Sequence, residues 1–133
     1  MKDLTYLLPC RIETEDRLRN VITSVTYILK CFPEAKVIVK EVDTQSHFSE
    51  SALPRIKKYV SDTSQLKHVF EQSAETFFHK TRILNDLCVL ADTPIIYNHD
   101  VDVIVPKNSH ELAYRAITKE GSDAVYPLSL IHI

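Results

Sequence analysis

A shortage of glycine restricts this chain more than any other feature, because Gly121 is the only glycine among its 133 residues. Glycine makes up about 7% of an average protein. The loops that bind phosphate through backbone amides, in P-loop proteins and in dinucleotide-binding Rossmann domains, need several glycines at fixed spacing. Both kinds of site are therefore excluded. If the chain binds a phosphorylated ligand, charged groups must supply the contacts: a metal ion held by carboxylates, or arginine and lysine side chains.

Strand-like and helix-like segments alternate along the chain, which is the pattern of an α/β layered fold. Short apolar runs predict four strands, and Pro9 is expected to stop the first of them. The four predicted strands cover residues 4–8, 37–39, 67–70 and 94–98. A fifth strand is expected to begin at residues 124–126. We therefore predict one α/β domain without internal repeats.

Apolar residues three and four positions apart predict a helix of about four turns over residues 18–29, ended by Pro33. A second helix is expected over residues 77–88, with Phe77 and Phe78 more suited to the core than to stacking on a ligand. Its expected core face consists of Phe77, Thr81, Leu84 and Cys88. A third helix is predicted through Leu112 and Ile117 with Asn108 or Ser109 as its cap, and a short one fits residues 56–60.

The charge of the chain is nearly balanced, with a formal net charge of −2. This balance gives no reason to expect a nucleic acid or an anionic membrane as a partner. No apolar run approaches the roughly 20 residues that a membrane helix needs, and the acidic N-terminus does not resemble a signal peptide. Cys10, Cys31 and Cys88 lack metal-type spacing, so we expect free, mostly buried thiols in a reducing compartment. These features predict a cytoplasmic protein without a transmembrane segment.

Two aspartates, Asp100 and Asp102, come directly after the strand expected at residues 94–98. If the backbone stays extended there, their side chains project to the same side, and that of His99 to the other. Paired carboxylates suit a hard divalent cation that completes its shell with substrate phosphates, and α/β sheets bind ligands at the carboxyl ends of their strands. The alternative is a solvated turn, which is less favoured because the two acids interrupt an apolar run. His99 is expected to be a packed or surface histidine.

Three segments in this order resemble landmarks of the GT-A glycosyltransferases: residues 7–11, 78–85 and 100–106. Their spacing is similar to that of family 2 enzymes of bacterial capsule synthesis and of the β-1,4-galactosyltransferase group. The resemblance implies an α/β fold with a Rossmann-like mixed sheet flanked by helices. Residues 1–127 would form the donor-binding domain for a nucleotide sugar, truncated at its C-terminus. The implied activity is metal-dependent, inverting hexosyl transfer from a UDP-sugar to a saccharide or glycan acceptor in polysaccharide biosynthesis.

The resemblance also implies roles for individual residues around the donor. Pro9 and Arg11 would line the nucleotide pocket, Glu41 would contact the base or ribose, and Lys80 would lie near the nucleotide and its phosphates. Many family members have two adjacent acids after the second strand, whereas Glu41 and Asp43 are separated here. The alternatives are a surface ion pair for Arg11, a solvated strand end for Glu41 and a solvated helix residue for Lys80.

On the same resemblance, Asp102 would bind Mn²⁺ or Mg²⁺ directly and Asp100 would face the ribose or the metal. The catalytic base of inverting members is expected beyond the end of this sequence. We therefore expect these 133 residues alone to lack transferase activity.

The last six residues, 128–133, resemble the in-frame translation of CTG TCT CTT ATA CAC ATC, a transposon end used to prepare sequencing libraries. We expect residues 128–133 to be adapter read-through and the natural gene to diverge near Pro127. The alternative is that these residues are natural.

Two other functions compete with sugar transfer. The chain could be a non-catalytic α/β binding or interaction module in which the aspartates form a structural metal site or a cap. A sugar-phosphate nucleotidyltransferase is less favoured, because such enzymes normally have a glycine-rich loop after the first strand, and residues 9–13 contain no glycine.

Overall fold

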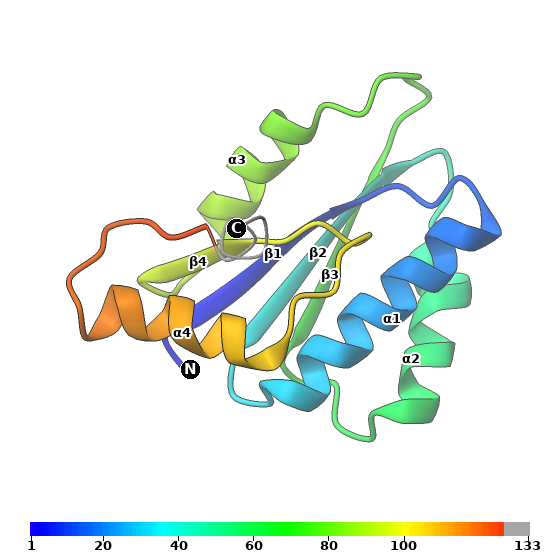
Figure 1. Cartoon of the computed structure of the whole chain (residues 1–133). Coiled ribbons are helices and arrows are strands. Elements are labelled where there is room, and N and C mark those ends of the chain that lie inside the picture. The colour runs from blue at the N-terminus through cyan, green and yellow to red at the C-terminus, as the bar shows by residue number, and fades with distance from the viewer. Residues whose placement is uncertain (127–133) are drawn as a thin grey trace. The chain divides into compact units, whose positions relative to one another are not determined.

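The computed structural model describes residues 1–126, which fall into two compact units: Met1–Val103 and a second unit that begins at Ile104. The first unit is built on a four-stranded parallel sheet of order β3-β2-β1-β4 (Figure 1). The strands are β1 (Leu4–Cys10), β2 (Lys36–Asp43), β3 (Leu66–Gln72) and β4 (Ile95–Asn98). All four strands that we predicted are present, which confirms the α/β class.

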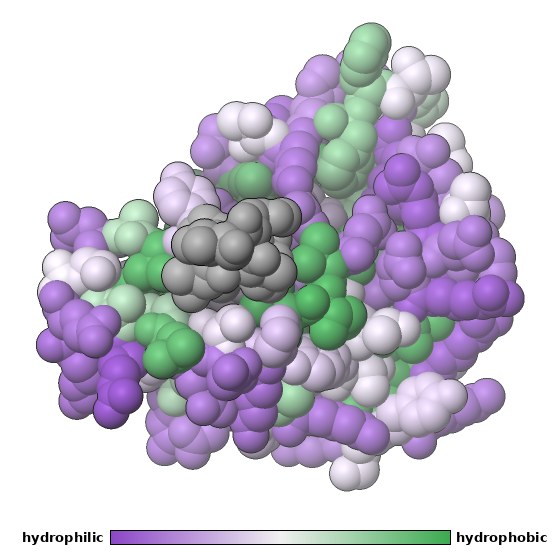
Figure 2. Space-filling view, viewed as in Figure 1, coloured by the Kyte–Doolittle hydropathy of each residue, from purple (hydrophilic) through white to green (hydrophobic). Residues whose placement is uncertain are grey.

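Helices cover both faces of this sheet (Figure 1). One face carries α1 (Glu15–Cys31), the π-helical turn η1 (Phe48–Ala52) and α2 (Leu53–Tyr59), and the other carries α3 (Lys80–Leu90). The short helix expected at residues 56–60 is therefore longer and begins earlier. The surface on the side of α1 and α2 is mostly hydrophilic (Figure 2), as expected for helices that bury only one face.

The first helix forms as its periodicity predicts. Thr14 caps α1, and its side-chain oxygen accepts a hydrogen bond from the backbone N–H of Arg17 at 3.1 Å. The buried side chains of α1 recur at the predicted spacing: Leu18, Val21, Ile22, Ser24, Val25, Ile28 and Leu29. This face packs against the sheet and fixes the N-terminal end of α1 next to the carboxyl end of β1.

Pro9 does not stop the first strand, contrary to our prediction, because β1 continues to Cys10. The carbonyl of Leu7 accepts a hydrogen bond from the N–H of His99 at 3.0 Å, so Leu7 directs its backbone groups toward β4. Pro9 lies two residues later and directs its nitrogen to the same side, where β4 has already ended at Asn98. The missing N–H of proline therefore costs no hydrogen bond in the sheet.

The core face of α3 also differs from the prediction. Ile83 and Leu87 are fully buried against Leu7 and Ile38, whereas Cys88 is exposed. Phe77 is 76% exposed, because the helix begins only at Lys80 and leaves this residue in the preceding loop. The three cysteines are free as expected, but they are not all buried.

Replacing Leu87 with alanine is expected to lower the free energy of unfolding by about 2–4 kcal/mol, because the change opens a cavity between α3 and the sheet. Leu87 is 0% exposed, whereas Val89 on the same helix is 85% exposed. The matched change Val89→Ala is expected to cost less than about 0.5 kcal/mol. Urea unfolding of both variants tests this, and equal losses would contradict the burial of Leu87 against the sheet.

The second unit contains α4 (Lys107–Thr118), which begins directly after Pro106 rather than at Asn108 or Ser109. Proline before the first helical residue suits a helix start, because no intrahelical N–H bond is lost there. Residues 124–126 form no strand, so the predicted fifth strand does not begin there. The expected adapter read-through at 128–133 lies outside the described residues. No helix within residues 1–126 is both long and apolar enough to cross a membrane.

Candidate functional site

A cavity of about 380 Å³ opens at the carboxyl ends of β1 and β4 in the first unit. The chain runs from β1 through α1 to β2 on one side, and from β3 through α3 to β4 on the other. β1 and β4 are therefore neighbours at the point where the strand order reverses, and ligands bind at such points in α/β sheets. The cavity is lined by Pro9, Arg11, Glu13, Arg17, Phe78, Lys80, Asp100, Val101, Asp102 and Val103.

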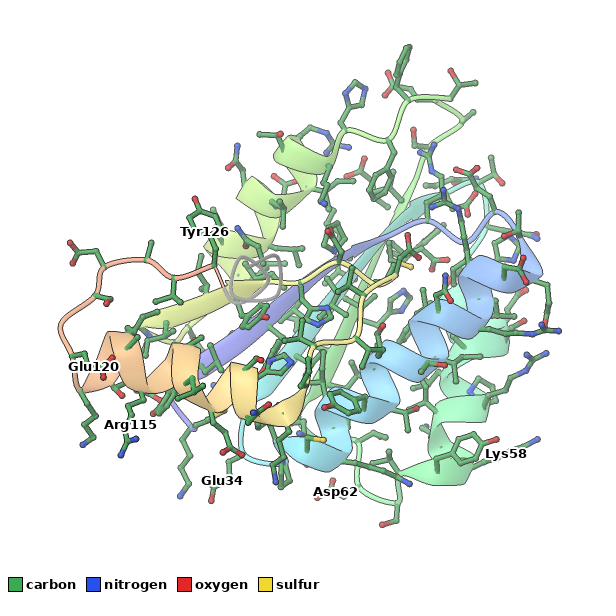
Figure 3. The ribbon with its side chains drawn as sticks, in the orientation of Figure 1. Glu34, Lys58, Asp62, Arg115, Glu120 and Tyr126 are labelled. Carbon is green, nitrogen blue, oxygen red and sulfur yellow. The ribbon has the colours of Figure 1, made fainter. Side chains whose placement is uncertain are left out.

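The ends of two helices contribute to the wall of this cavity. Arg17 lies in the first turn of α1, and Lys80 is the first residue of α3. The N-terminal end of a helix carries a partial positive charge and attracts anions. Other charged residues, such as Glu34, Lys58 and Asp62, lie at the opposite end of the unit (Figure 3). The cavity thus combines carboxylates with cations and positive helix ends.

Asp100 and Asp102 lie in a turn, so the prediction of an extended segment was wrong. β4 ends at Asn98, and the N–H of Val103 donates to the carbonyl of Asp100 at 3.4 Å. The Asp100 carboxylate forms an ion pair with Lys80, and the Asp102 carboxylate accepts a hydrogen bond from the Asn20 amide at 3.1 Å. The two carboxylates therefore contact different helices, while both line the cavity.

His99 is buried, as expected for a packed histidine. Its ring lies near those of Tyr6 and Tyr97, with centroid distances of 6.1 and 5.4 Å. Burial lowers the pKa of His99, because the charged imidazolium would lose its hydration. A neutral His99 packed on two aromatic rings supports the turn that carries Asp100.

Arg11 lines the cavity but is held mainly by the backbone of neighbouring segments. Its guanidinium donates to the carbonyls of Val42 at 2.9 Å, Glu75 at 3.0 Å and Thr76 at 3.2 Å. It also lies over the ring of Phe78, 5.5 Å from the centroid. These contacts replace the surface ion pair that we considered for Arg11, and they tie the loop before α3 to the end of the sheet.

Glu41 does not line the cavity. β2 continues to Asp43, so Glu41 lies within the strand and is 0% exposed, and the solvated strand end was wrong. Its carboxylate accepts hydrogen bonds from the Ser46 hydroxyl, the backbone N–H groups of His47 and Phe48, and the His68 ring. Burial alone raises the pKa of Glu41, but these hydrogen bonds outweigh it and the pKa lies below its ordinary value. Glu41 fixes the start of η1.

Charged side chains also fix α3 to the sheet. Lys40 on β2 is almost buried, and its ammonium group contacts Asp86 of α3 at 2.7 Å and Glu71 of β3 at 3.3 Å. Arg82 of α3 contacts the same two carboxylates at 3.3 and 2.9 Å. This network holds the helix in place, so Lys80 at its first position has a fixed backbone next to the cavity.

Arg17 is a cavity residue that we did not identify from the sequence. Among residues 1–126 its guanidinium has no ion-pair partner, whereas Arg19 on the same helix lies 3.9 Å from both Glu15 and Asp16. The only available signal is its place three residues after the Thr14 cap, in the turn that follows β1. Such a position is common for exposed helix residues, so the sequence pattern does not distinguish a binding residue.

The donor atoms at the cavity partly fit a divalent cation. Asp100 and Asp102 supply the hard oxygen ligands that Mn²⁺ and Mg²⁺ prefer. Within the described part of the chain, however, no three His, Cys, Asp or Glu side chains are grouped to hold a metal. One or two carboxylates are enough for a cation that takes its remaining ligands from substrate phosphates and water. The site therefore suits a cation that binds together with a phosphorylated ligand.

No protein-family model matches the chain, and no curated protein sequence matches it. Among solved structures, it is similar to the mannosyltransferase PcManGT from Pyrobaculum calidifontis in complex with GDP-Man and Mn²⁺, with a TM-score of 0.64 and 16% identity. The match covers 88% of this chain and 32% of the other, so this chain spans about a third of its neighbour's length. The likeness confirms the predicted α/β fold, with a Rossmann-like sheet flanked by helices.

Proposed function

We propose that this chain is the donor-binding part of a glycosyltransferase, and that its cavity binds the diphosphate of a nucleotide sugar together with a divalent cation. The observation that supports this most is the composition of the cavity at the sheet switch point. The carboxylates of Asp100 and Asp102 follow β4 there. The positively charged side chains of Arg17 and Lys80 lie at the starts of α1 and α3. The solved structure with the same fold contains both GDP-Man and Mn²⁺.

The charges of the cavity suit two ligands of opposite sign better than one. A diphosphate alone would meet the carboxylates of Glu13, Asp100 and Asp102, whereas a cation alone would meet Arg17 and Lys80. A diphosphate with its cation satisfies both sets at once. When bound, the cation would neutralise the charge that develops on the departing nucleoside diphosphate.

Each residue of the wall has a defined part in this proposal. Arg17 and Lys80 bind phosphate oxygens, and Asp100 and Asp102 hold the cation. Arg11 positions the loop before α3, because its donors are used by backbone carbonyls. The contact of Glu41 with a base or ribose stays a prediction from the resemblance, and its enclosed carboxylate gives that prediction no support.

The proposal names the class of donor, a nucleotide sugar, and leaves the nucleotide open. UDP is the nucleotide that the resemblance implies, whereas the solved structure contains GDP-Man, so both belong in the first test. Transfer of a hexose to a saccharide acceptor with inversion, in capsule or other polysaccharide synthesis, stays part of the proposal from the resemblance. We assign no catalytic base to residues 1–126.

Calorimetric titration of the chain with UDP and GDP, with and without Mn²⁺, tests the proposal. We expect one of the two nucleotides to bind, and to bind more tightly with Mn²⁺. Arg17→Gln is expected to weaken that binding about tenfold, because it removes a charge-assisted hydrogen bond to phosphate. Arg19→Gln is the matched control, since Arg19 is a neighbouring arginine outside the cavity wall, and it is expected to change affinity by less than about twofold.

The other outcomes separate the rival functions. If neither nucleotide binds in the presence of Mn²⁺, the proposal fails and a binding or interaction module is the better description. Release of pyrophosphate from a nucleoside triphosphate and a sugar phosphate would instead identify a nucleotidyltransferase.

A further inference from the structure

We propose that Lys80 takes the place of the metal in the ligand-free chain, and that cation and diphosphate displace the Lys80–Asp100 pair together. This inference rests on the proposed function and adds a mechanism of control to it. Each ligand raises the affinity for the other. When the pair opens, the cation contacts the Asp100 carboxylate and the diphosphate contacts the Lys80 ammonium group, so only the two ligands together satisfy both charges. Lys80 thus binds one of the two ligands and sets the coupling between them.

The contact that supports the proposal spans the cavity wall. Lys80 begins α3 and Asp100 follows β4, and their side chains form an ion pair. Both residues line the cavity, and their side chains are 50% and 51% exposed. An ion pair with this exposure contributes little to the stability of the chain, because water solvates both of its partners. It can therefore open when a ligand offers either partner a stronger contact.

When the Lys80–Asp100 pair opens, only the Lys80 side chain needs to move. The network of Lys40 and Arg82 with Asp86 holds α3 on the sheet, so the backbone of Lys80 has little freedom to move. The lysine side chain is long and flexible, and it can turn from a carboxylate to a phosphate oxygen without a shift of the helix. The exchange therefore needs no rearrangement of the fold.

The second carboxylate of the cavity has a neutral partner. Asp102 accepts a hydrogen bond from the Asn20 amide, and among residues 1–126 no lysine or arginine side chain forms an ion pair with it. A metal ion that approaches this turn meets competition only at Asp100, where Lys80 is already bound. The competition between the protein's own cation and the metal is thus confined to one contact.

The charges explain why the two ligands depend on each other. A cation alone must displace Lys80 from Asp100 and leaves that ammonium group unpaired beside a divalent charge. A diphosphate alone is attracted by Lys80 but repelled by Asp100 and Asp102. When both ligands bind, the cation contacts the carboxylates and the diphosphate contacts Lys80. Thermodynamic linkage then requires that each ligand tighten the other by the same factor, about tenfold at the usual size of such couplings.

Lys80→Met tests the role of the ammonium group. We expect the variant to bind Mn²⁺ alone about fivefold more tightly, because the competitor is gone, and to bind UDP or GDP alone more weakly. The coupling factor between Mn²⁺ and the nucleotide is expected to fall below that of the wild type, to the part that direct contact between the cation and the phosphates supplies. Electron paramagnetic resonance of Mn²⁺ and calorimetry with each nucleotide measure the four affinities without any activity assay.

Lys36→Met is the matched control for this variant. Lys36 is 48% exposed and contacts Asp92 at 2.8 Å, so the change removes the same charge from a similar ion pair outside the cavity wall. We expect the coupling factor of this control to equal that of the wild type. A similar loss of coupling in Lys36→Met would show that net charge alone produces the effect and would overturn the proposal.

Asp100→Asn removes the charge of the other partner of the ion pair, and it tests the proposal if Lys80→Met does not fold. Because it frees Lys80 and removes a repulsive charge, we expect nucleotide alone to bind more tightly and Mn²⁺ to add less to that affinity. Full coupling in Lys80→Met, or no gain in affinity for the nucleotide alone in Asp100→Asn, would overturn the role of Lys80 and leave the proposed function standing. If the wild-type chain binds no nucleotide with Mn²⁺, the proposed function and this inference fail together.

Discussion

Replacing Asp102 with asparagine is expected to weaken Mn²⁺-dependent nucleotide binding by more than about tenfold while the free energy of unfolding stays nearly unchanged. The change removes one of the two carboxylates that we propose hold the cation. The asparagine oxygen can still accept the hydrogen bond that Asn20 donates to Asp102, so the turn keeps its contact with α1. Calorimetry with and without Mn²⁺, together with thermal unfolding, separates binding from folding.

Asp16→Asn is the control for this experiment. Asp16 lies in the first turn of α1 and its side chain is 91% exposed, but it does not line the cavity. We expect its removal to leave the effect of Mn²⁺ intact. Unchanged metal-dependent binding in Asp102→Asn would contradict the metal site. In an enzyme that contains this domain, the same substitution is expected to abolish metal-dependent transfer.

Replacing Glu41 with alanine is expected to lower the free energy of unfolding by about 3–5 kcal/mol. The carboxylate is fully buried, and its removal leaves four donors without their acceptor, two of them backbone N–H groups at the start of η1. Glu34→Ala is the control, since that side chain is 60% exposed, and it is expected to cost less than about 0.5 kcal/mol. Urea unfolding measures both variants. A loss of stability in Glu41→Ala as small as that of the control would mean that water molecules replace the carboxylate as hydrogen-bond acceptors.

The pKa of Glu41 gives this prediction a dependence on pH. Its pKa lies below the ordinary value of 4.5 in the folded chain, because the hydrogen bonds favour the charged form against the effect of burial. A lowered pKa stabilises the folded chain above the unfolded pKa, and that stabilisation is lost as the pH falls through the folded pKa. The stability gap between the wild type and Glu41→Gln is therefore expected to be larger at neutral pH than at a pH below both pKa values. A gap that does not change over this range would contradict the lowered pKa.

The parts of the fold that depend on local patterns were predictable from the sequence. The buried face of α1 follows directly from the spacing of its apolar residues, and the four strands follow from short apolar runs. Two other features depend on neighbours that are distant in the sequence. Pro9 is tolerated inside β1 because β4 ends early. The buried face of α3 consists of Ile83 and Leu87 because these two residues pack against Leu7 and Ile38 of the sheet.

The candidate site also has features that were predictable from the sequence and features that were not. The resemblance selected six residues, and all of them except Glu41 line one cavity, because the strand order brings β1 and β4 together. The five are Pro9, Arg11, Lys80, Asp100 and Asp102. The local geometry was not predictable, since the turn at residues 100–103 follows from the end of the pairing between β4 and β1.

Glu41 and Arg17 show what a linear pattern leaves undetermined. The resemblance implied that Glu41 contacts the base or ribose, with a solvated strand end as the alternative. In the structure η1 and His68 enclose its carboxylate. Arg17 has the sequence context of any exposed arginine, and its place at the cavity emerges only when α1 is packed on the sheet.

The cavity wall contains no glycine among the residues that line it, and this has a consequence for how such a domain diverges. A loop that binds phosphate through its main chain is committed to one backbone shape, which few substitutions can alter without loss of binding. Here the charge is on side chains such as Glu13, Arg17 and Lys80, so one codon change alters the charge of the wall and leaves the backbone as it is. Substitutions at a handful of positions would therefore change the charge that a ligand meets in this cavity, on a scaffold that need not be rebuilt.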